Sequence, residues 1–304
     1  MPFTFHTHSG QFCNHAHGTL EEVIESAKSK KFHTIGLSEH IPRTRAKDLY
    51  PEESHLTPPD LFELFENYVE EARRLKALNE NKINIIIGAE TEYITPEATS
   101  LIEELRSKYS LDYVVGSLHH VKEIPIDFDK ETYQKALDSC GGDYNELYSV
   151  YFDAQYELIT RIKPEVIGHF DLIRIFSPKS EQSLADRPEV WAKVQRNIDA
   201  AIKYNAIFEI NSRAWKKGLP NAYPLKDVLQ ELINRGAKFT ISDDSHGPRD
   251  VGLYYSNLFE YLKTMNIKTL SYFVKDSDND VLRCVELTDA LNHPFWTLNG
   301  YNQN

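Results

Sequence analysis

Short apolar runs alternate along this chain with longer segments in which apolar residues recur at helical spacing. The runs that predict strands cover residues 3–8, 33–40, 83–93, 113–121, 166–171, 206–211, 238–244 and 269–274. The segments that predict helices cover residues 19–30, 59–78, 96–108, 144–162, 188–204, 225–234 and 250–265. Continuous apolar strands that alternate with helices predict a parallel sheet buried on both faces.

The number of strand–helix units indicates the fold class. Seven or eight units in roughly 275 residues favour a closed or nearly closed α/β barrel over an open, doubly wound sheet. No G-x-G-x-x-G follows the first strand and no P-loop occurs, so the nucleotide-binding versions of an α/β fold lose their main support. We expect one domain over residues 1–304, with a last strand and tail in 269–304. Two polar insertions, 42–58 and 122–143, would lie on the C-terminal rim of such a barrel.

Composition excludes several classes of protein. The chain has 34 Lys and Arg against 46 Asp and Glu, a formal charge of −12, which argues against a general nucleic-acid binder. It contains no apolar run of 18 residues and no signal-like N-terminus, so we expect neither a membrane span nor export. Three widely spaced cysteines, Cys13, Cys140 and Cys284, are typical of reduced thiols in a cytoplasmic protein. The composition leaves the oligomeric state open.

Polar residues that bind metals stand at the C-terminal ends of the predicted strands. They are His6 with His8, His40, Glu90, His119 or His120, His169, Asn211, and Asp244 with His246. The loops of a barrel converge at that end, so these residues would meet in space. Each motif alone is weak, because a strand-end histidine is commonly an ordinary hydrogen-bonded residue. Their joint occurrence predicts a multinuclear site for Zn²⁺, Mn²⁺ or Fe.

Six motifs occur in a characteristic order between residue 6 and about residue 250: FHTHSGQFCNHAHG, GLSEH, GAETEY, GSLHH, IGHFD and ISDDSH. Together they resemble the polymerase and histidinol phosphatase (PHP) superfamily, and more narrowly its histidinol-phosphate phosphatases. The resemblance implies a distorted (β/α)₇ TIM-like barrel that binds three divalent metal ions (Zn, Mn or Fe). The ligands it implies are His6, His8, His15, His40, Glu90, His119, His169, Asp244 and His246. His17 is the alternative to His15, while His120, Glu92 and Asp243 would be neighbours of ligands.

The implied reaction is the hydrolysis of a small phosphate monoester, histidinol phosphate, in histidine biosynthesis. Glu90 would bridge two metals that activate the attacking water, with Asp244 and His246 as further catalytic residues. Arg174 and Arg213 follow predicted strands, and the resemblance assigns both to the substrate phosphate. Two alternatives stay open. One is another phosphoesterase of the superfamily that acts on nucleotides or small phosphodiesters, and the other is a metal-binding protein without catalytic activity.

Overall fold

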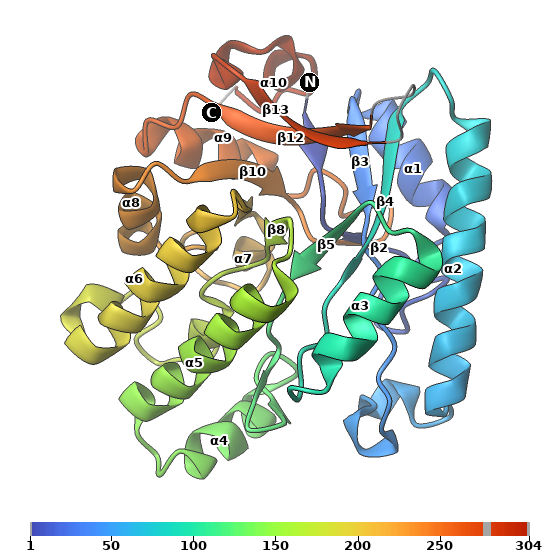
Figure 1. The fold of residues 1–304 in the computed structure, drawn as a ribbon. Helices are drawn as coiled ribbons and strands as arrows, with labels where there is room; N and C mark the ends of the chain where they lie inside the picture. Colours follow the sequence, from blue (N-terminus) through green and yellow to red (C-terminus); the bar gives the residue numbers. More distant parts are fainter. Residues whose placement is uncertain (1, 276–280, 303–304) are drawn as a thin grey trace.

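Seven parallel strands curve into a nearly closed barrel with helices around it, in a computed structural model that describes residues 2–275 and 281–302 (Figure 1). The strand order within the described residues is β1-β3-β4-β5-β8-β9-β10. These strands are β1 (Phe3–Thr4), β3 (Thr34–Leu37), β4 (Asn84–Glu90), β5 (Tyr113–Gly116), β8 (Val166–Ile167), β9 (Ile207–Asn211) and β10 (Lys238–Ser242). The predicted parallel α/β barrel is thus confirmed.

The two ends of the sheet approach each other through a short second ladder. β2 (Thr7–His8) continues the direction of β1, and β11 (Ser245–His246) follows β10. They pair in parallel, with Thr7 opposite Ser245 and His8 opposite His246. This ladder brings the first and last metal-ligand motifs of the sequence side by side.

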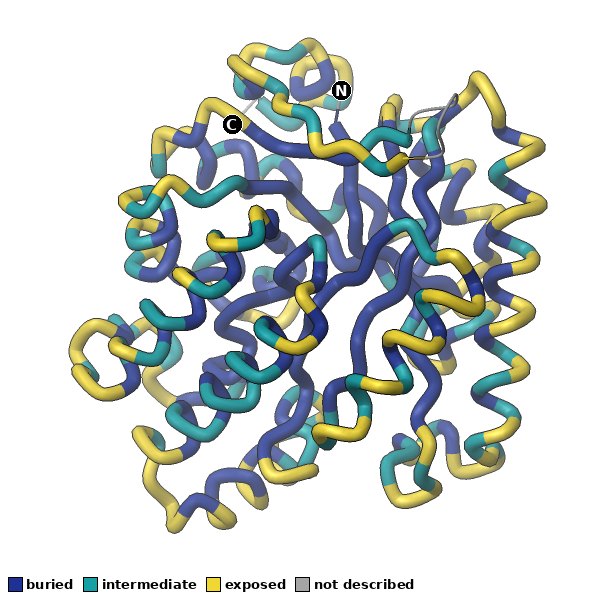
Figure 2. The backbone as a smooth tube through the Cα atoms, viewed as in Figure 1, coloured by how far each residue is buried: buried dark blue, intermediate teal, exposed yellow. Residues whose placement is uncertain are grey.

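Helices surround the barrel, and buried positions alternate with exposed ones along the longer helices (Figure 2). They are α1 (Leu20–Ser29), α2 (Pro58–Leu78), α3 (Ala98–Tyr109), α4 (Lys130–Ser139), α5 (Tyr144–Ile162), α6 (Pro188–Lys203), α7 (Arg213–Lys216), α8 (Lys226–Asn234), α9 (Tyr255–Thr264) and α10 (Pro294–Leu298). Short 3₁₀ turns are η1 (Ala46–Asp48), η2 (Pro51–Glu53), η3 (Leu172–Arg174), η4 (Leu184–Asp186) and η5 (Ala290–Asn292).

Local sequence accounts for several helix ends. Thr19 caps α1 by accepting a hydrogen bond from the backbone N–H of Glu22, whose carboxylate in turn accepts from the Thr19 N–H. Proline occupies the first turn of α2 and of α6, where its missing N–H costs nothing. Within residues 2–275 and 281–302, no helix is long and apolar enough to cross a membrane.

The structure differs from the predicted elements at three places. The insertion 122–143 contains a hairpin of β6 (His120–Val121) and β7 (Ile124–Pro125) followed by α4, because Tyr133, Ala136 and Leu137 recur at helical spacing behind the cap residue Asp129. Helix α9 begins five residues later than predicted. The predicted strand 269–274 is present as β12 (Leu270–Lys275), but it pairs antiparallel with β13 (Leu282–Leu287) instead of joining the barrel.

The β12–β13 hairpin covers the N-terminal end of the barrel. Phe273 packs edge-on against Phe5 inside the barrel, and Tyr272 stacks on Phe3 with ring centroids 5.0 Å apart. The hydroxyl of Tyr113 donates to the Phe5 carbonyl at 2.9 Å across the interior. One end of the barrel is therefore filled with aromatic side chains, which leaves the C-terminal end for a site.

Candidate metal centre

The strand ends meet around the carboxylate of Glu90, the last residue of β4, which is 1% exposed. Its Oε1 lies 2.9 Å from His6 Nε2, 3.2 Å from His169 Nε2 and 3.3 Å from His119 Nε2. Its Oε2 lies 3.0 Å from His40 Nδ1 and 3.3 Å from His8 Nε2. One carboxylate thus stands among five histidines from four segments that are distant from one another in sequence.

Asp244 and His246 reach the same centre from the segment after β10. Asp244 Oδ1 lies 3.6 Å from His6 Nε2, 3.7 Å from His8 Nε2 and 3.5 Å from His246 Nδ1. The backbone of Asp244 is left-handed, with φ of 45°, a conformation that aspartate tolerates better than most residues. This bend separates β10 from β11 and precedes the pairing of β11 with β2.

The donor atoms fit divalent metal ions. They form groups of three within 4.8 Å: His6, His8 and Glu90; Glu90, His119 and His169; His6, His169 and Asp244; His8, His40 and His246; Cys13, His15 and His40. Zinc bonds place tetrahedral ligand atoms about 3.3–3.6 Å apart, close to the separations measured here. The Nε2 atoms of His6 and His8 and both ring nitrogens of His40 are buried and make no hydrogen bond of acceptable geometry with the described residues. Because a buried nitrogen without a partner costs free energy, these residues are suited to binding metal.

The electrostatics of the centre require positive charge. Burial raises the pKa of the Glu90 carboxyl, but His6, His119 and His40 lower it well below its usual range, so Glu90 is ionised. Burial lowers the pKa of His6, but Glu90, Asp244 and Glu209 raise it well above its ordinary value. The carboxylates therefore favour a proton on His6, which bound cations would displace.

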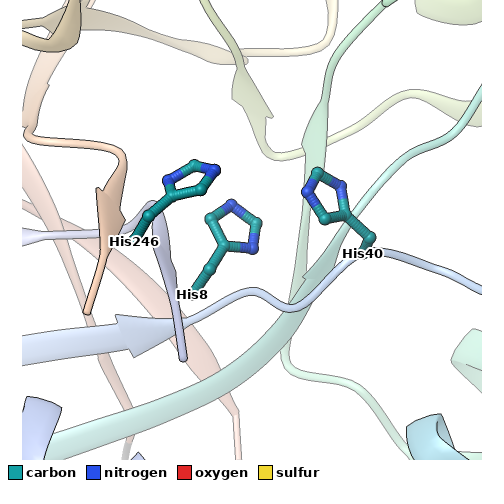
Figure 3. A group of neighbouring side chains, drawn as sticks. All are labelled: His8, His40 and His246. Atoms are coloured by element: carbon teal, nitrogen blue, oxygen red, sulfur yellow. The ribbon is translucent and has the colours of Figure 1, made fainter. Parts of the chain in front are cut away.

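His15 and His17 occupy different places. The His15 ring centroid lies 5.4 Å from that of His40 and 4.9 Å from that of His246, at the edge of a group in which His8, His40 and His246 point toward one another (Figure 3). His17 is exposed, and its backbone N–H donates to the His246 carbonyl at 3.1 Å. The structure brings His15 to the centre, and His17 contributes backbone rather than an imidazole.

The two histidines of GSLHH also separate. His119 presents Nε2 to Glu90 and Nδ1 to Glu92, at 3.3 Å and 3.6 Å. His120 lies farther away, with its Nδ1 4.0 Å from Glu92 Oε2, and burial lowers the pKa of His120 to about 4. Glu92 also lies 3.0 Å from His40 Nδ1. His119 thus faces the centre, and Glu92 contacts both His119 and His40.

Two buried acids that lie behind His6 and His8 were not among the residues expected from the sequence. Glu209 Oε2 lies 3.1 Å from His6 Nδ1. Glu39 Oε2 lies 3.5 Å from His8 Nδ1, and Glu39 Oε1 accepts the Ser9 N–H at 2.8 Å. A sequence signal existed for both, since each acid lies in or beside an apolar strand where a carboxylate is costly without a partner.

A cavity of about 270 Å³ opens onto the centre. Among the described residues it is lined by His15, His40, Tyr50, Glu52, Glu90, Glu92, His119, Asp127, Phe128, His169, Leu172, Arg213, Lys217, Tyr223, Asp244 and His246. Residues of both polar insertions, such as Tyr50 and Phe128, form part of its wall. Candidate metal ligands, cations, acids and aromatic rings thus share one small pocket, as is common in ligand sites.

The two predicted phosphate-binding arginines differ in position. Arg213 lines the cavity, and its Nη1 donates to Asp250 Oδ2 at 2.7 Å. Arg174 is 1% exposed and is absent from the described residues that line the cavity. The turn η3 directs Arg174 into the protein, where Nε donates to Asp171 at 2.7 Å and Nη2 to the Ala222 carbonyl at 2.9 Å. Arg174 therefore lies behind the cavity wall, where its guanidinium packs over the ring of the lining residue Tyr223. Its predicted contact with the substrate phosphate stays a prediction.

A parallel α/β barrel with histidine and carboxylate donors clustered at the C-terminal ends of its strands defines a metal-binding barrel protein. More specifically, the chain belongs to the PHP domain family, whose sequence profile matches residues 4–213.

Two relatives cover nearly the whole chain. A Schizosaccharomyces pombe protein named a probable histidinol-phosphatase is 50% identical over 281 residues, which are 92% of this chain and 92% of that protein. The histidinol-phosphatase of Saccharomyces cerevisiae is 31% identical over 329 aligned residues, covering 96% of this chain and 98% of that protein.

A solved structure has the same fold. The histidinol phosphate phosphatase of Lactococcus lactis, in complex with zinc, L-histidinol and phosphate, aligns with a TM-score of 0.67 over 89% of this chain and 95% of that chain. At 20% identity this likeness supports the barrel fold alone.

Proposed function

We propose that this protein is a metal-dependent phosphatase that hydrolyses histidinol phosphate to histidinol and phosphate in histidine biosynthesis. The observation that carries the proposal is the position of Glu90, whose two oxygens lie within 3.3 Å of five imidazole nitrogens at the floor of a small cavity. The 50% identity to a probable histidinol-phosphatase over 92% of the chain supports the same activity.

We also propose that the centre binds three divalent ions of zinc, manganese or iron. The residues that would hold them are His6, His8, His15, His40, Glu90, His119, His169, Asp244 and His246. Bound divalent cations would lower the pKa of the attacking water and neutralise charge on the phosphoryl oxygens. Glu90, with imidazoles on both of its oxygens, is placed to bridge two of these ions.

Asp244 and His246 border the cavity beside Glu90. Burial raises the pKa of Asp244, but His6, His246 and Arg213 lower it well below its usual range. As a carboxylate, Asp244 could accept a hydrogen bond from the attacking water and orient it. His246 follows two residues later on β11 and faces the same space.

Arg213 would hold the phosphate. Asn211 Oδ1 accepts the Arg213 backbone N–H at 2.8 Å, and Asp250 Oδ2 accepts a hydrogen bond from the guanidinium at 2.7 Å. A guanidinium fixed in this way offers donors to the phosphoryl oxygens without having to reorganise. Lys217 adds a second positive charge to the same wall.

The rest of the cavity suits a substrate with a cationic amine and an aromatic ring. Glu52 and Asp127 supply negative charge, and Tyr50 stacks on Phe128 with ring centroids 5.8 Å apart. Histidinol phosphate carries an amine and an imidazole in addition to its phosphate. A nucleotide has no amine of this kind, so the two acids favour the amino-alcohol phosphate.

The test is release of inorganic phosphate from histidinol phosphate, a nucleoside monophosphate and an aryl phosphate, with Zn²⁺, Mn²⁺ or Fe²⁺ supplied to the protein. We expect the highest kcat/KM for histidinol phosphate, and no turnover by the Glu90→Gln variant. A higher kcat/KM for the nucleotide would indicate another phosphoesterase of the family. Absence of turnover with every metal would favour a metal-binding protein without catalytic activity.

A further inference from the structure

Glu209 is a buried acid that touches the metal centre from behind. It lies in the middle of β9, between Phe208 and Ile210, which are both fully buried. Its Oε2 is 3.1 Å from His6 Nδ1. The opposite nitrogen of the same ring, Nε2, lies 2.9 Å from Glu90. The His6 imidazole is thus held between a carboxylate at the centre and a carboxylate behind it.

Glu209 also connects other parts of the site. Its Oε1 accepts the backbone N–H of His169 at 2.5 Å and the side-chain amide of Asn211 at 2.9 Å, and its Oε2 accepts the hydroxyl of Ser242 at 2.8 Å. Asn211 in turn accepts the backbone N–H of Arg213 at 2.8 Å. A single carboxylate therefore joins two predicted metal ligands and the segment that carries the phosphate-binding arginine.

Packing alone does not explain a charge at this position. A buried carboxylate loses several kcal/mol of hydration, and an apolar side chain would be the cheaper choice within a buried strand. All the contacts of Glu209 described above are to neutral donors or to His6. Of these contacts, only the His6 ring connects Glu209 to positive charge at the centre.

We propose that Glu209 is a positioning residue that keeps the proton of His6 on Nδ1, leaves Nε2 free to bind metal, and so increases the affinity of the centre for its divalent ions. Outer carboxylates that accept the N–H of a ligating imidazole orient the ring and raise its basicity, and their loss typically weakens metal binding about 10- to 100-fold. This role of Glu209 in metal binding does not depend on which phosphate ester the protein hydrolyses.

The experiment compares Glu209→Gln with Ser242→Ala. The first variant removes the charge and preserves the size of the side chain, while the second removes one hydrogen bond to Glu209 and leaves its charge. Zn²⁺ affinity is measured by competition with a chelating dye, without substrate. In parallel, ¹⁵N-histidine spectra of the zinc-loaded protein report which nitrogen of His6 carries the proton, with a His6→Asn variant to assign the signal.

We expect Glu209→Gln to weaken the affinity for at least one zinc ion 10- to 100-fold and to alter the His6 Nδ1–H signal. Ser242→Ala should change the affinity less than threefold. Unchanged zinc affinity in a folded Glu209→Gln protein would overturn the proposal, as would an equal loss in both variants, because packing would then explain the effect. If Glu209→Gln does not fold, Glu209→Asp replaces it. This variant keeps the charge and must bind zinc more tightly than Glu209→Ala, and equal affinities would overturn the proposal.

Discussion

Replacing Arg213 with alanine tests the phosphate end of the proposed site. The side chain is 11% exposed, so its guanidinium lies in a medium of lower effective dielectric than water. A unit positive charge about 4 Å from a unit negative charge there contributes about 4 kcal/mol, and water that enters the space of the lost side chain recovers part of this. We therefore expect a loss of about 2.7–4 kcal/mol of transition-state stabilisation, or a 100- to 1,000-fold lower kcat/KM.

The assay is phosphate release from histidinol phosphate over a range of concentrations, with the metal content of each preparation measured in parallel. Arg213→Ala should raise KM and lower kcat while the metal content stays constant. Lys216→Ala is the matched control, because Lys216 also contacts Asp250, at 2.8 Å, but is not among the described residues that line the cavity. Its kcat/KM should stay within about threefold of the parent value.

Two results would refute this reasoning. A kcat/KM within threefold of the parent value for a folded, metal-loaded Arg213→Ala protein would mean that Arg213 does not hold the phosphate. Equal losses of kcat/KM in Arg213→Ala and Lys216→Ala would mean that both substitutions act by displacing Asp250, and not by removing a contact with the phosphate.

Four other outcomes follow from the geometry of the centre. Glu90→Gln should abolish phosphate release and lower the metal content, and near-normal turnover would show that Glu90 does not bridge the ions. His119→Asn should lower kcat far more than His120→Asn in the same assay, and the reverse order would mean that the assignment within GSLHH is wrong. His15→Ala should reduce the zinc bound per chain, measured by elemental analysis, whereas His17→Ala should not. Removal of metal by a chelator should lower the Tm in calorimetry, because buried carboxylates lose their cations, and an unchanged Tm would contradict this account of the centre's charge.

The barrel and the list of candidate ligands could be predicted from local pattern. Alternation of apolar strands with helices requires a parallel sheet, and the C-terminal ends of parallel strands in a barrel converge. His40 and Glu90 lie at two of those ends, and in the structure His40 Nδ1 is 3.0 Å from Glu90 Oε2. The same pattern could not show that β12 leaves the barrel, since an isolated apolar run does not specify its partner.

The local pattern could mark the two acids behind the centre as buried carboxylates, but it could not show which histidines they contact. Glu39 and Glu209 lie in or beside strands, and their role depends on which ring nitrogen they face across the barrel. Arg174 and Arg213 both follow strands, but Arg174 turns inward to Asp171 while Arg213 lines the cavity. The position of a residue after a strand fixes where its backbone lies, while the packing around it decides where its functional group lies.

The sequence by itself determined the class of fold, the residue types of the centre and their distribution over the strand ends, because these follow from periodicity and from the chemistry of each side chain. Only the tertiary structure decided which histidine of a pair faces Glu90, which arginine reaches the cavity and which buried acids support the ligands. Those choices depend on distances between segments far apart in the chain, which no local pattern encodes.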